Sequence, residues 1–120
     1  MQYPAGMALI GKKTESIPGG LALVMGTVNP LSDPKMRMLV RSAVTKGDYG
    51  AVQEAHVLAA SLLPAGRELW GWWLDGVESL AKADDPDLGV FVRFTGDVAG
   101  IAPWGVLPAP ARQRLRALSG

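Results

Sequence analysis

Apolar residues recur at the spacing of a helix near the middle of the chain. Five of them share one helix face: Met36, Leu39, Val40, Ala43 and Val44. Asp33 followed by Pro34 is typical of an N-cap and a first helical position, and Gly47 is typical of a helix end. The pattern therefore predicts a helix over residues 34–46.

Two more helices are predicted after it. The second spans about residues 49–63, between an Asp48 cap and Pro64, and its apolar face is formed by Val52, Ala55, His56, Ala59 and Leu63. The third spans about residues 65–83 and gathers on one side Trp70, Trp73, Leu74, Val77 and Leu80 or Ala81. The run Asp84-Asp85-Pro86-Asp87 ends it. We expect these three helices to pack as an antiparallel core.

The pattern changes near residue 89. Residues 89–94 alternate in the manner of a β-strand, Thr95-Gly96-Asp97 has the composition of a turn, and residues 98–102 follow as a second strand. A short basic helix is predicted over about residues 109–118, with Leu107, Ala111, Leu115 and Leu118 in register. The predicted fold class is therefore mainly α (α+β): a three-helix core with a small β-hairpin and a short C-terminal helix.

The N-terminal part differs in character. Pro18-Gly19-Gly20 interrupts any regular element, and the apolar run 21–28 is too short for its periodicity to separate a buried strand from a short helix. We expect residues 1–32 to form an irregular arm with this apolar segment, and residues 33–120 to form one helical domain. The apolar run is far shorter than the ~20 residues needed to cross a bilayer, so no membrane span is predicted.

The second predicted helix resembles part of a repeat family. Gly47-Asp48-Tyr49, Ala59, Leu62, Pro64 and Trp70 are similar to the second helix of a tetratricopeptide repeat and the start of the next repeat. Val52 and His56 depart from that pattern. A repeat array needs at least three units, and no second copy is visible, so we interpret the region as a helical hairpin. The resemblance implies binding of a peptide or partner protein rather than catalysis.

The amino-acid composition limits the classes of protein to which this chain can belong. The 120 residues are 48% hydrophobic and 19% charged, which provides enough apolar side chain for one modest core. The chain has no cysteine, so disulfides and cysteine-based metal sites are excluded. The start lacks the basic region of a secretory signal, and a cytoplasmic location is predicted. The net charge of +1 provides no field for nucleic acid, which we do not expect as a partner.

Charge is nevertheless segregated along the chain. Cations predominate up to Lys46, anions predominate between Glu68 and Asp87, and the last nine residues hold Arg112, Arg114 and Arg116. Such segregation suits a head-to-tail or self-complementary contact between chains, although ordinary solvated faces explain it equally well.

The candidates for catalysis all fail a chemical requirement. The stretch from Gly6 to Lys12 matches the start of a phosphate-binding P-loop, but Lys13 stands where a serine or threonine must follow the lysine. His56 is the only histidine and lies on an apolar helix face, as expected of a packed or interfacial histidine. The carboxylates Asp84, Asp85 and Asp87 lack the spacing of a calcium loop. We therefore predict no enzyme, no cofactor and no metal.

The tryptophans and the terminal arginines are the candidate interaction residues. Trp72 lies about 200° around the helix from Trp70, so one side of that helix cannot bury both. Either a second layer covers Trp72, or it is left for a partner, since tryptophan is common at interface centres. Trp104, Arg112 and Arg116 complete the predicted interaction surface, with the arginines at its rim.

The sequence thus predicts a non-enzymatic interaction or assembly module that binds a protein partner or self-associates as an oligomer. Its composition suggests a bacterial or phage structural or assembly component. The alternative is a small nucleic-acid-associated regulator that uses Lys12, Lys13, Arg37 and Arg41.

Overall fold

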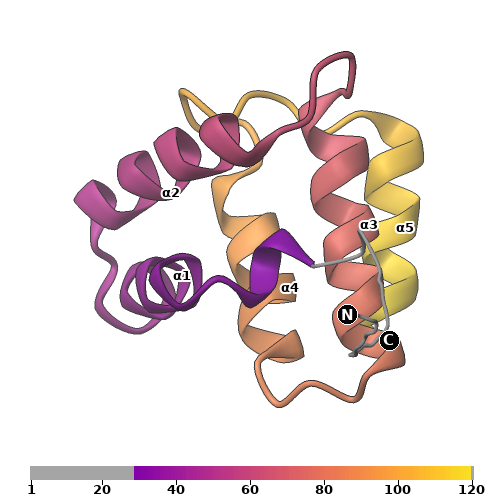
Figure 1. Ribbon diagram of the computed structural model, residues 1–120, viewed down its shortest axis with the longest axis horizontal. Helices are drawn as coiled ribbons and strands as arrows, with labels where there is room; N and C mark the ends of the chain where they lie inside the picture. Colours follow the sequence, from indigo (N-terminus) through magenta and orange to yellow (C-terminus); the bar gives the residue numbers. More distant parts are fainter. Residues whose placement is uncertain (1–28, 120) are drawn as a thin grey trace, which may run out of the picture.

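The computed structural model describes residues 29–119, whose regular structure is entirely helical. A short 3₁₀ helix precedes five α-helices (Figure 1): η1 Pro30–Ser32, α1 Pro34–Lys46, α2 Tyr49–Leu62, α3 Leu69–Lys82, α4 Leu88–Val98 and α5 Ala109–Ser119. Most of the predicted arm, including its apolar run 21–28, lies outside the described residues. None of the described helices is long and apolar enough to cross a membrane.

The helices form two groups around α4 (Figure 1). On one side, α1 and α2 pack together as a hairpin, and α1 also packs on α4. On the other side, α3 and α5 lie side by side and both contact α4. The short helix η1 links the groups because it contacts both α1 and α3. The hairpin of α1 and α2 and the seam between α4 and α5 therefore lie on different parts of the molecule.

The predicted limits of the first two helices and the last one are confirmed to within a residue. The carboxylate of Asp33 accepts hydrogen bonds from two backbone N–H groups in the first turn of α1, at 2.8 and 3.2 Å. Gly47 ends α1 with a φ of +63°, and Asp48 caps α2 through the N–H of Ala51 at 3.2 Å. Because the first N–H groups of a helix have no partner within it, these side chains determine where each helix begins.

The third helix begins four residues later than predicted, at Leu69. Glu68 is its N-cap: the carboxylate accepts hydrogen bonds from the N–H groups of Trp70 at 2.8 Å and Gly71 at 2.7 Å. Gly66 has a φ of +82°, in the left-handed region, so the chain turns there before a helix can start.

The predicted β-hairpin is wrong: residues 88–98 form α4, and no strand occurs between residues 29 and 119. The buried side chains of α4 are Phe91, Phe94, Thr95 and Val98, which lie on one helix face. Residues 90–94 also fit the alternation of a strand, and over so short a run the two periods overlap. The predicted turn at Thr95-Gly96-Asp97 falls inside the helix, and the described part of the chain is therefore all helical.

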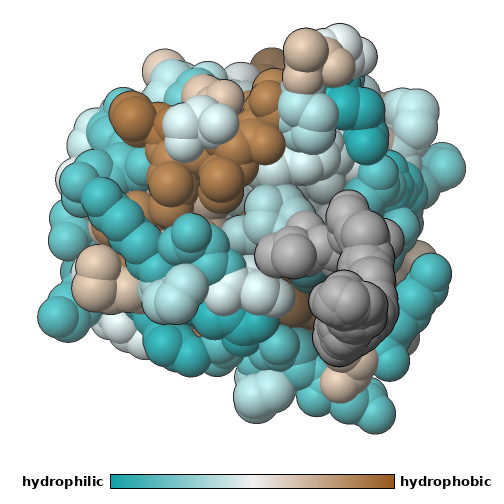
Figure 2. All heavy atoms as spheres, in the orientation of Figure 1, coloured by the Kyte–Doolittle hydropathy of each residue, from teal (hydrophilic) through white to brown (hydrophobic). Residues whose placement is uncertain are grey.

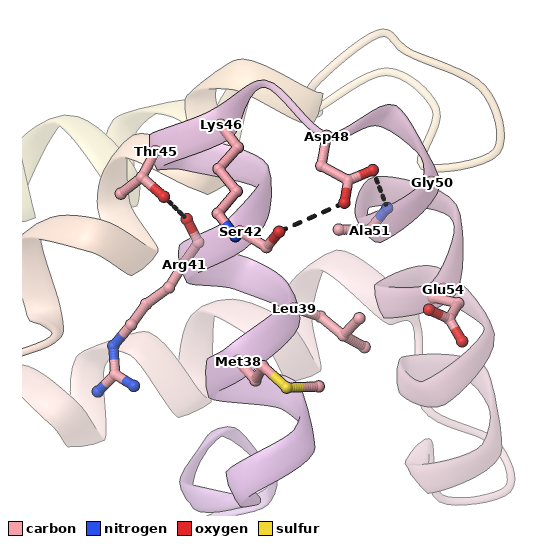
Figure 3. A pocket seen from close by; sticks show the side chains of 10 residues that line it. All are labelled: Met38, Leu39, Arg41, Ser42, Thr45, Lys46, Asp48, Gly50, Ala51 and Glu54. Atoms are coloured by element: carbon pink, nitrogen blue, oxygen red, sulfur yellow. Dashed lines mark hydrogen bonds between the residues drawn. The ribbon is translucent and has the colours of Figure 1, made fainter.

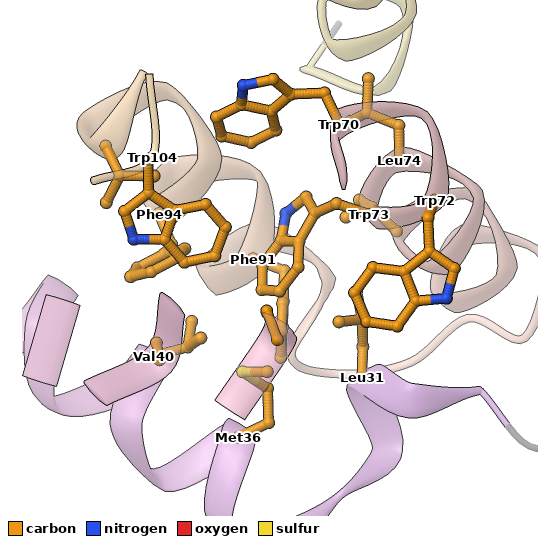
Figure 4. Close-up of a cluster of buried hydrophobic side chains, with 14 of the residues drawn as sticks. Leu31, Met36, Val40, Trp70, Trp72, Trp73, Leu74, Phe91, Phe94 and Trp104 are labelled. Carbon is orange, nitrogen blue, oxygen red and sulfur yellow. The ribbon is translucent and has the colours of Figure 1, made fainter. Parts of the chain in front are cut away.

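Aromatic side chains fill the centre of the core (Figure 4). The indole of Trp73 in α3 is fully buried, and its ring centroid lies 6.0 Å from Phe91, 5.8 Å from Phe94 and 5.0 Å from Trp104. Its Nε1 donates a hydrogen bond to the Thr95 hydroxyl at 2.8 Å. Aromatic pairs at these separations stabilise a core beyond the area they bury. They hold α3, α4 and the loop before α5 in one arrangement.

Candidate interaction surfaces

Trp72 is buried in the core, which corrects its expected place on an exposed surface. Its side chain is only 7% exposed. Figure 4 shows Leu31 of η1 beside it, and Leu31 also lies against Gly76, one turn further along α3. Asn29 Nδ2 donates to the carbonyl of Gly76 at 3.0 Å and so holds η1 in place. The segment before α1 therefore provides the layer that covers Trp72.

Trp104 is also buried, with 3% of its side chain exposed. Its Nε1 donates to the backbone carbonyl of Val52 in α2 at 3.0 Å, and its ring lies 5.4 Å from that of Trp70. All four tryptophans are thus inside the core, and the predicted place of Trp72 and Trp104 on an interaction surface is wrong. Neither Trp72 nor Trp104 is available as an exposed anchor.

His56 packs against the aromatic core. Its ring meets that of Trp104 edge to face, with centroids 5.2 Å apart and planes at 82°. The imidazole is half-buried on the inner side of α2. This geometry agrees with the packed histidine that the sequence pattern predicted.

A network of ion pairs joins α1 to the loop before α4. The guanidinium of Arg37 donates to both carboxylate oxygens of Asp85, at 2.8 and 2.7 Å, and to Asp87 at 2.7 Å. Arg41 donates to Asp87 at 2.6 Å. The hydrogen bond from Arg37 lowers the pKa of Asp85 to about 2, and Arg37 also lowers the pKa of Asp87.

These pairs bear on the nucleic-acid alternative. Two of its four cations, Arg37 and Arg41, are paired with carboxylates of the same chain, and Arg37 is largely covered. Lys12 and Lys13 lie outside the described residues. The geometry of α1 therefore does not support a phosphate-binding face.

A second network joins α5 to α3. Arg114 donates to both carboxylate oxygens of Glu78, at 2.9 and 2.7 Å, and to Asp75 at 2.7 Å. Arg67 also pairs with Asp75, at 2.7 Å. The pKa values of Glu78 and Asp75 are lowered by these hydrogen bonds, and the pKa of Arg114 is raised. Many of the charged residues that cluster by sign along the sequence are therefore paired with opposite charges within the same chain.

Arg112 and Arg116 lie on the opposite side of α5 from this network, toward α4. Both are exposed, and within residues 29–119 neither forms an ion pair with a carboxylate. Arg112 donates to the backbone carbonyl of Leu107 at 3.0 Å. The two predicted rim residues thus sit together, one helical turn apart, beside the seam between α4 and α5.

Two adjoining hollows run along that seam. One, of about 450 Å³, is lined by Gly89, Val92, Arg93, Gly96, Asp97, Leu115, Leu118 and Ser119. The other, of about 220 Å³, is lined by Gly96, Ala99, Leu107, Arg112, Leu115, Arg116 and Ser119. Because they share Gly96, Leu115 and Ser119, they form one surface, which we call the α4–α5 groove.

A further hollow, of about 730 Å³, lies between α1 and α2 (Figure 3). Near the turn of the hairpin its lining is polar, and Ser42 donates to Asp48 there at 3.3 Å. Met38 and Leu39 line it on α1, with Glu54 on α2. Its lining holds two cations, Arg41 and Lys46, and two anions, Asp48 and Glu54.

Apolar side chains continue from this hollow along α2. Figure 2 shows them gathered over α2 on the side turned to the viewer. Met38 is 57% exposed, Val57 is 67% exposed and Leu62 is 37% exposed. Leu62 also lines a hollow of about 280 Å³ against Pro30 and Pro34 at the open end of the hairpin. We call Met38, Val57, Leu58 and Leu62, with the hollows beside them, the hairpin face.

The sequence pattern did not single out the hairpin face. In α2 the residues that pack inward are small, namely Ala51, Ala55 and Ala59. Of the larger apolar residues of α2, Leu58 and Leu62 follow Ala55 by three and seven positions and so share or border this stripe, whereas Val57 lies on the other side of the helix. Leu58 is half-buried, and Val57 and Leu62 are exposed. Because small residues occupy the buried positions of α2, the larger residues Val57 and Leu62 keep much of their apolar surface exposed, and this is the signal in the sequence that indicates the surface.

The remaining candidates for chemistry do not converge on a site. Within residues 29–119, no three histidine, aspartate or glutamate side chains are grouped to hold a metal ion. Comparison with known proteins finds no matching family model, no similar curated protein and no similar solved structure. The two surfaces above are therefore the basis for assigning a function.

Proposed function

We propose that the protein is a non-enzymatic assembly module that associates with a second copy of itself through the hairpin face. The observation that carries this proposal is the exposure of Met38, Val57 and Leu62 on the two helices that line the hollow of about 730 Å³. Exposed apolar side chains that lie together, rather than scattered singly, commonly mark a surface for protein contact.

The charges around the hollow support a second copy as the occupant. A two-fold contact brings the same patch together from both chains, so it needs both signs of charge within that patch. The lining provides both signs: among the described residues Lys46 and Glu54 form no ion pair, whereas Arg41 is held by Asp87 and Asp48 caps α2. A rotated second copy can place its Glu54 near Lys46 and its Val57 over the apolar part of the face.

The energetics also favour association. Burial of a valine or leucine side chain is worth roughly 1.5–3 kcal/mol relative to full exposure. Val57 and Leu62 are surface residues of α2, so they can be changed without opening a cavity in the core. They are therefore suitable positions for testing the contact separately from folding.

The experiment compares two double variants by sedimentation velocity over a wide range of concentration. Val57→Ser with Leu62→Ser changes the hairpin face, and Ile101→Ser with Val106→Ser makes the same kind of change at exposed sites elsewhere. We expect the wild type and the second variant to form dimers, and the first variant to weaken the dimer by roughly tenfold or more. A wild type that is monomeric at every concentration would contradict the proposal.

The wider setting remains a prediction from composition. A cytoplasmic location and a bacterial or phage assembly role are proposed on the absence of cysteine and the small-residue-rich sequence.

A further inference from the structure

The α4–α5 groove combines an apolar floor with a positively charged rim. Leu115 and Leu118 are half-buried in its floor, together with Val92 of α4. Gly89 and Gly96 are exposed on the same helix, and a Cβ placed at either would meet no atom within 4 Å. The missing side chains at these positions leave the floor open.

The rim carries more positive than negative charge. Within residues 29–119, Arg93, Arg112 and Arg116 line the groove, against the one carboxylate of Asp97. Arg93 pairs with Asp97 at 3.2 Å, and both side chains are largely exposed, so this pair is worth little and can exchange partners. Between residues 29 and 119, Arg112 and Arg116 form no ion pair, and both line the groove beside Leu115.

From this arrangement we propose that the α4–α5 groove binds an acidic amphipathic helix of a different protein. Apolar side chains at helical spacing on the partner would rest on Leu115, Leu118 and Val92. Carboxylates on the flank of that helix would meet Arg112 and Arg116, whose planar guanidinium groups bind carboxylates through paired hydrogen bonds. Helices laid in apolar grooves are a common mode of peptide recognition.

The size of the groove sets the length of the partner. Helices α4 and α5 each have 11 residues, which corresponds to a length of about 16 Å. A partner helix of about three turns matches that length. Arg112 and Arg116 are four residues apart. Two carboxylates spaced by three or four residues on the partner helix can therefore each face one of these arginines.

Other occupants fit less well. In a second copy, the carboxylates of α3 are already held by Arg67 and Arg114, so they are not free to enter the groove. A nucleic acid would need a continuous row of cations along its phosphates. Here the arginines are separated by the apolar floor, which a nucleic acid would leave exposed to water.

The first test measures binding of synthetic peptides by fluorescence anisotropy. The probe is a peptide of about three helical turns with leucines on one face and glutamates beside them. The control peptide has lysines in place of the glutamates. We expect the acidic peptide to bind at least about tenfold more tightly than the basic one, and its affinity to fall as salt is raised.

The second test uses variants of the full chain. Arg112→Gln with Arg116→Gln removes the rim charge, and Lys35→Gln with Lys82→Gln removes two exposed cations that line neither surface as the matched control. We expect the first pair of substitutions to weaken binding of the acidic peptide by roughly tenfold. The control pair should change the affinity for this peptide by less than about twofold. Gly96→Leu fills the open floor, and we expect it to weaken binding by a similar factor.

Each variant is first checked for its helical content and thermal unfolding. If Gly96→Leu fails to fold, the arginine pair still decides the question, because those side chains are exposed. Three results would overturn the proposal: equal binding of acidic and basic peptides, wild-type affinity in the arginine variant, or tighter binding of a short oligonucleotide than of the peptide.

This inference is independent of self-association through the hairpin face. The variant Val57→Ser with Leu62→Ser should bind the acidic peptide with unchanged affinity, whereas Arg112→Gln with Arg116→Gln should still form the dimer. Failure of one proposal is therefore distinguishable from failure of the other.

Discussion

The indole N–H of Trp73 and the hydroxyl of Thr95 form a hydrogen bond of 2.8 Å in the fully buried centre of the core. Thr95 in turn donates to the carbonyl of Phe91 at 2.7 Å, one turn back in α4. A buried N–H group without an acceptor costs free energy, so this threonine satisfies the one polar atom of a central apolar side chain. The bond also determines which side of α4 faces α3.

Replacing Thr95 with valine tests this bond. Valine keeps the shape of the side chain but leaves the Trp73 N–H without its acceptor. We expect the free energy of unfolding to fall by about 1–3 kcal/mol, measured by urea unfolding followed by tryptophan fluorescence. Thr95→Ser is the control, because it keeps the hydroxyl and should cost at most about 1 kcal/mol. A valine variant as stable as the wild type, with the loss confined to the serine variant, would show that the methyl group, not the hydrogen bond, matters at this site.

Gly76 and Gly96 should respond in opposite ways to alanine. A Cβ at Gly76 would lie 2.9 Å from Leu31 side-chain carbons, whereas a Cβ at Gly96 meets nothing within 4 Å. Alanine at Gly96 should raise the free energy of unfolding by about 0.5–1 kcal/mol, because it is a better helix former than glycine. Alanine at Gly76 should lower it by about 1–3 kcal/mol through overpacking. Thermal and urea unfolding measure both.

The double variant Gly76→Ala with Leu31→Ala tests the cause. If the contact with Leu31 is responsible, the Gly76 substitution should cost clearly less once Leu31 is shortened. If the losses of stability in the two single variants simply add in the double variant, the cost of Gly76→Ala does not come from its contact with Leu31.

The features of the fold that depend on contacts between residues close in sequence could be predicted from the sequence. Asp33-Pro34, Gly47 and Asp48 determine the limits of α1 and α2 through contacts within a few residues, and those limits are confirmed. Helix α4 could not be distinguished from a strand, because residues 90–94 satisfy both periods. Contacts that are distant in sequence, such as Trp73 with Thr95, select the helix.

The interaction surfaces were predictable only in part. Arg112 and Arg116 could be named from the charge at the end of the chain, and they lie exposed together at the α4–α5 groove. The burial of Trp72 could not be foreseen, because it depends on Leu31 and Asn29, more than forty residues earlier. The pairing of Arg114 with Glu78 likewise depends on the packing of α5 against α3.

The pair Arg37–Asp85 should make stability depend on pH in the acid range. The ordinary pKa of an aspartate is 3.8, and Arg37 lowers that of Asp85 to about 2. The pair therefore contributes its full stabilisation above about pH 5 and loses it as the pH falls through 2. We expect Arg37→Met to be less stable than the wild type at neutral pH, and this difference to shrink as the pH approaches 2.

Urea unfolding at a series of pH values measures that difference. Arg93→Met is the matched control, because it removes an arginine from an exposed i,i+4 pair on α4. Its effect should stay below about 0.5 kcal/mol at neutral pH. An Arg37→Met deficit that is the same at neutral and acid pH would mean that packing of the arginine, and not its charge, stabilises the fold.

The three arginines of α5 should separate into one that supports the fold and two that do not. Arg114 joins α5 to Asp75 and Glu78 of α3, so Arg114→Gln should lower the free energy of unfolding by about 1 kcal/mol. Arg112→Gln and Arg116→Gln should each change it by less than about 0.5 kcal/mol. Hydrogen exchange of α5 should accelerate in the Arg114 variant alone. A comparable loss of stability in the Arg116 variant would mean that this residue supports the fold, which would remove the reason to regard its charge as available to a partner.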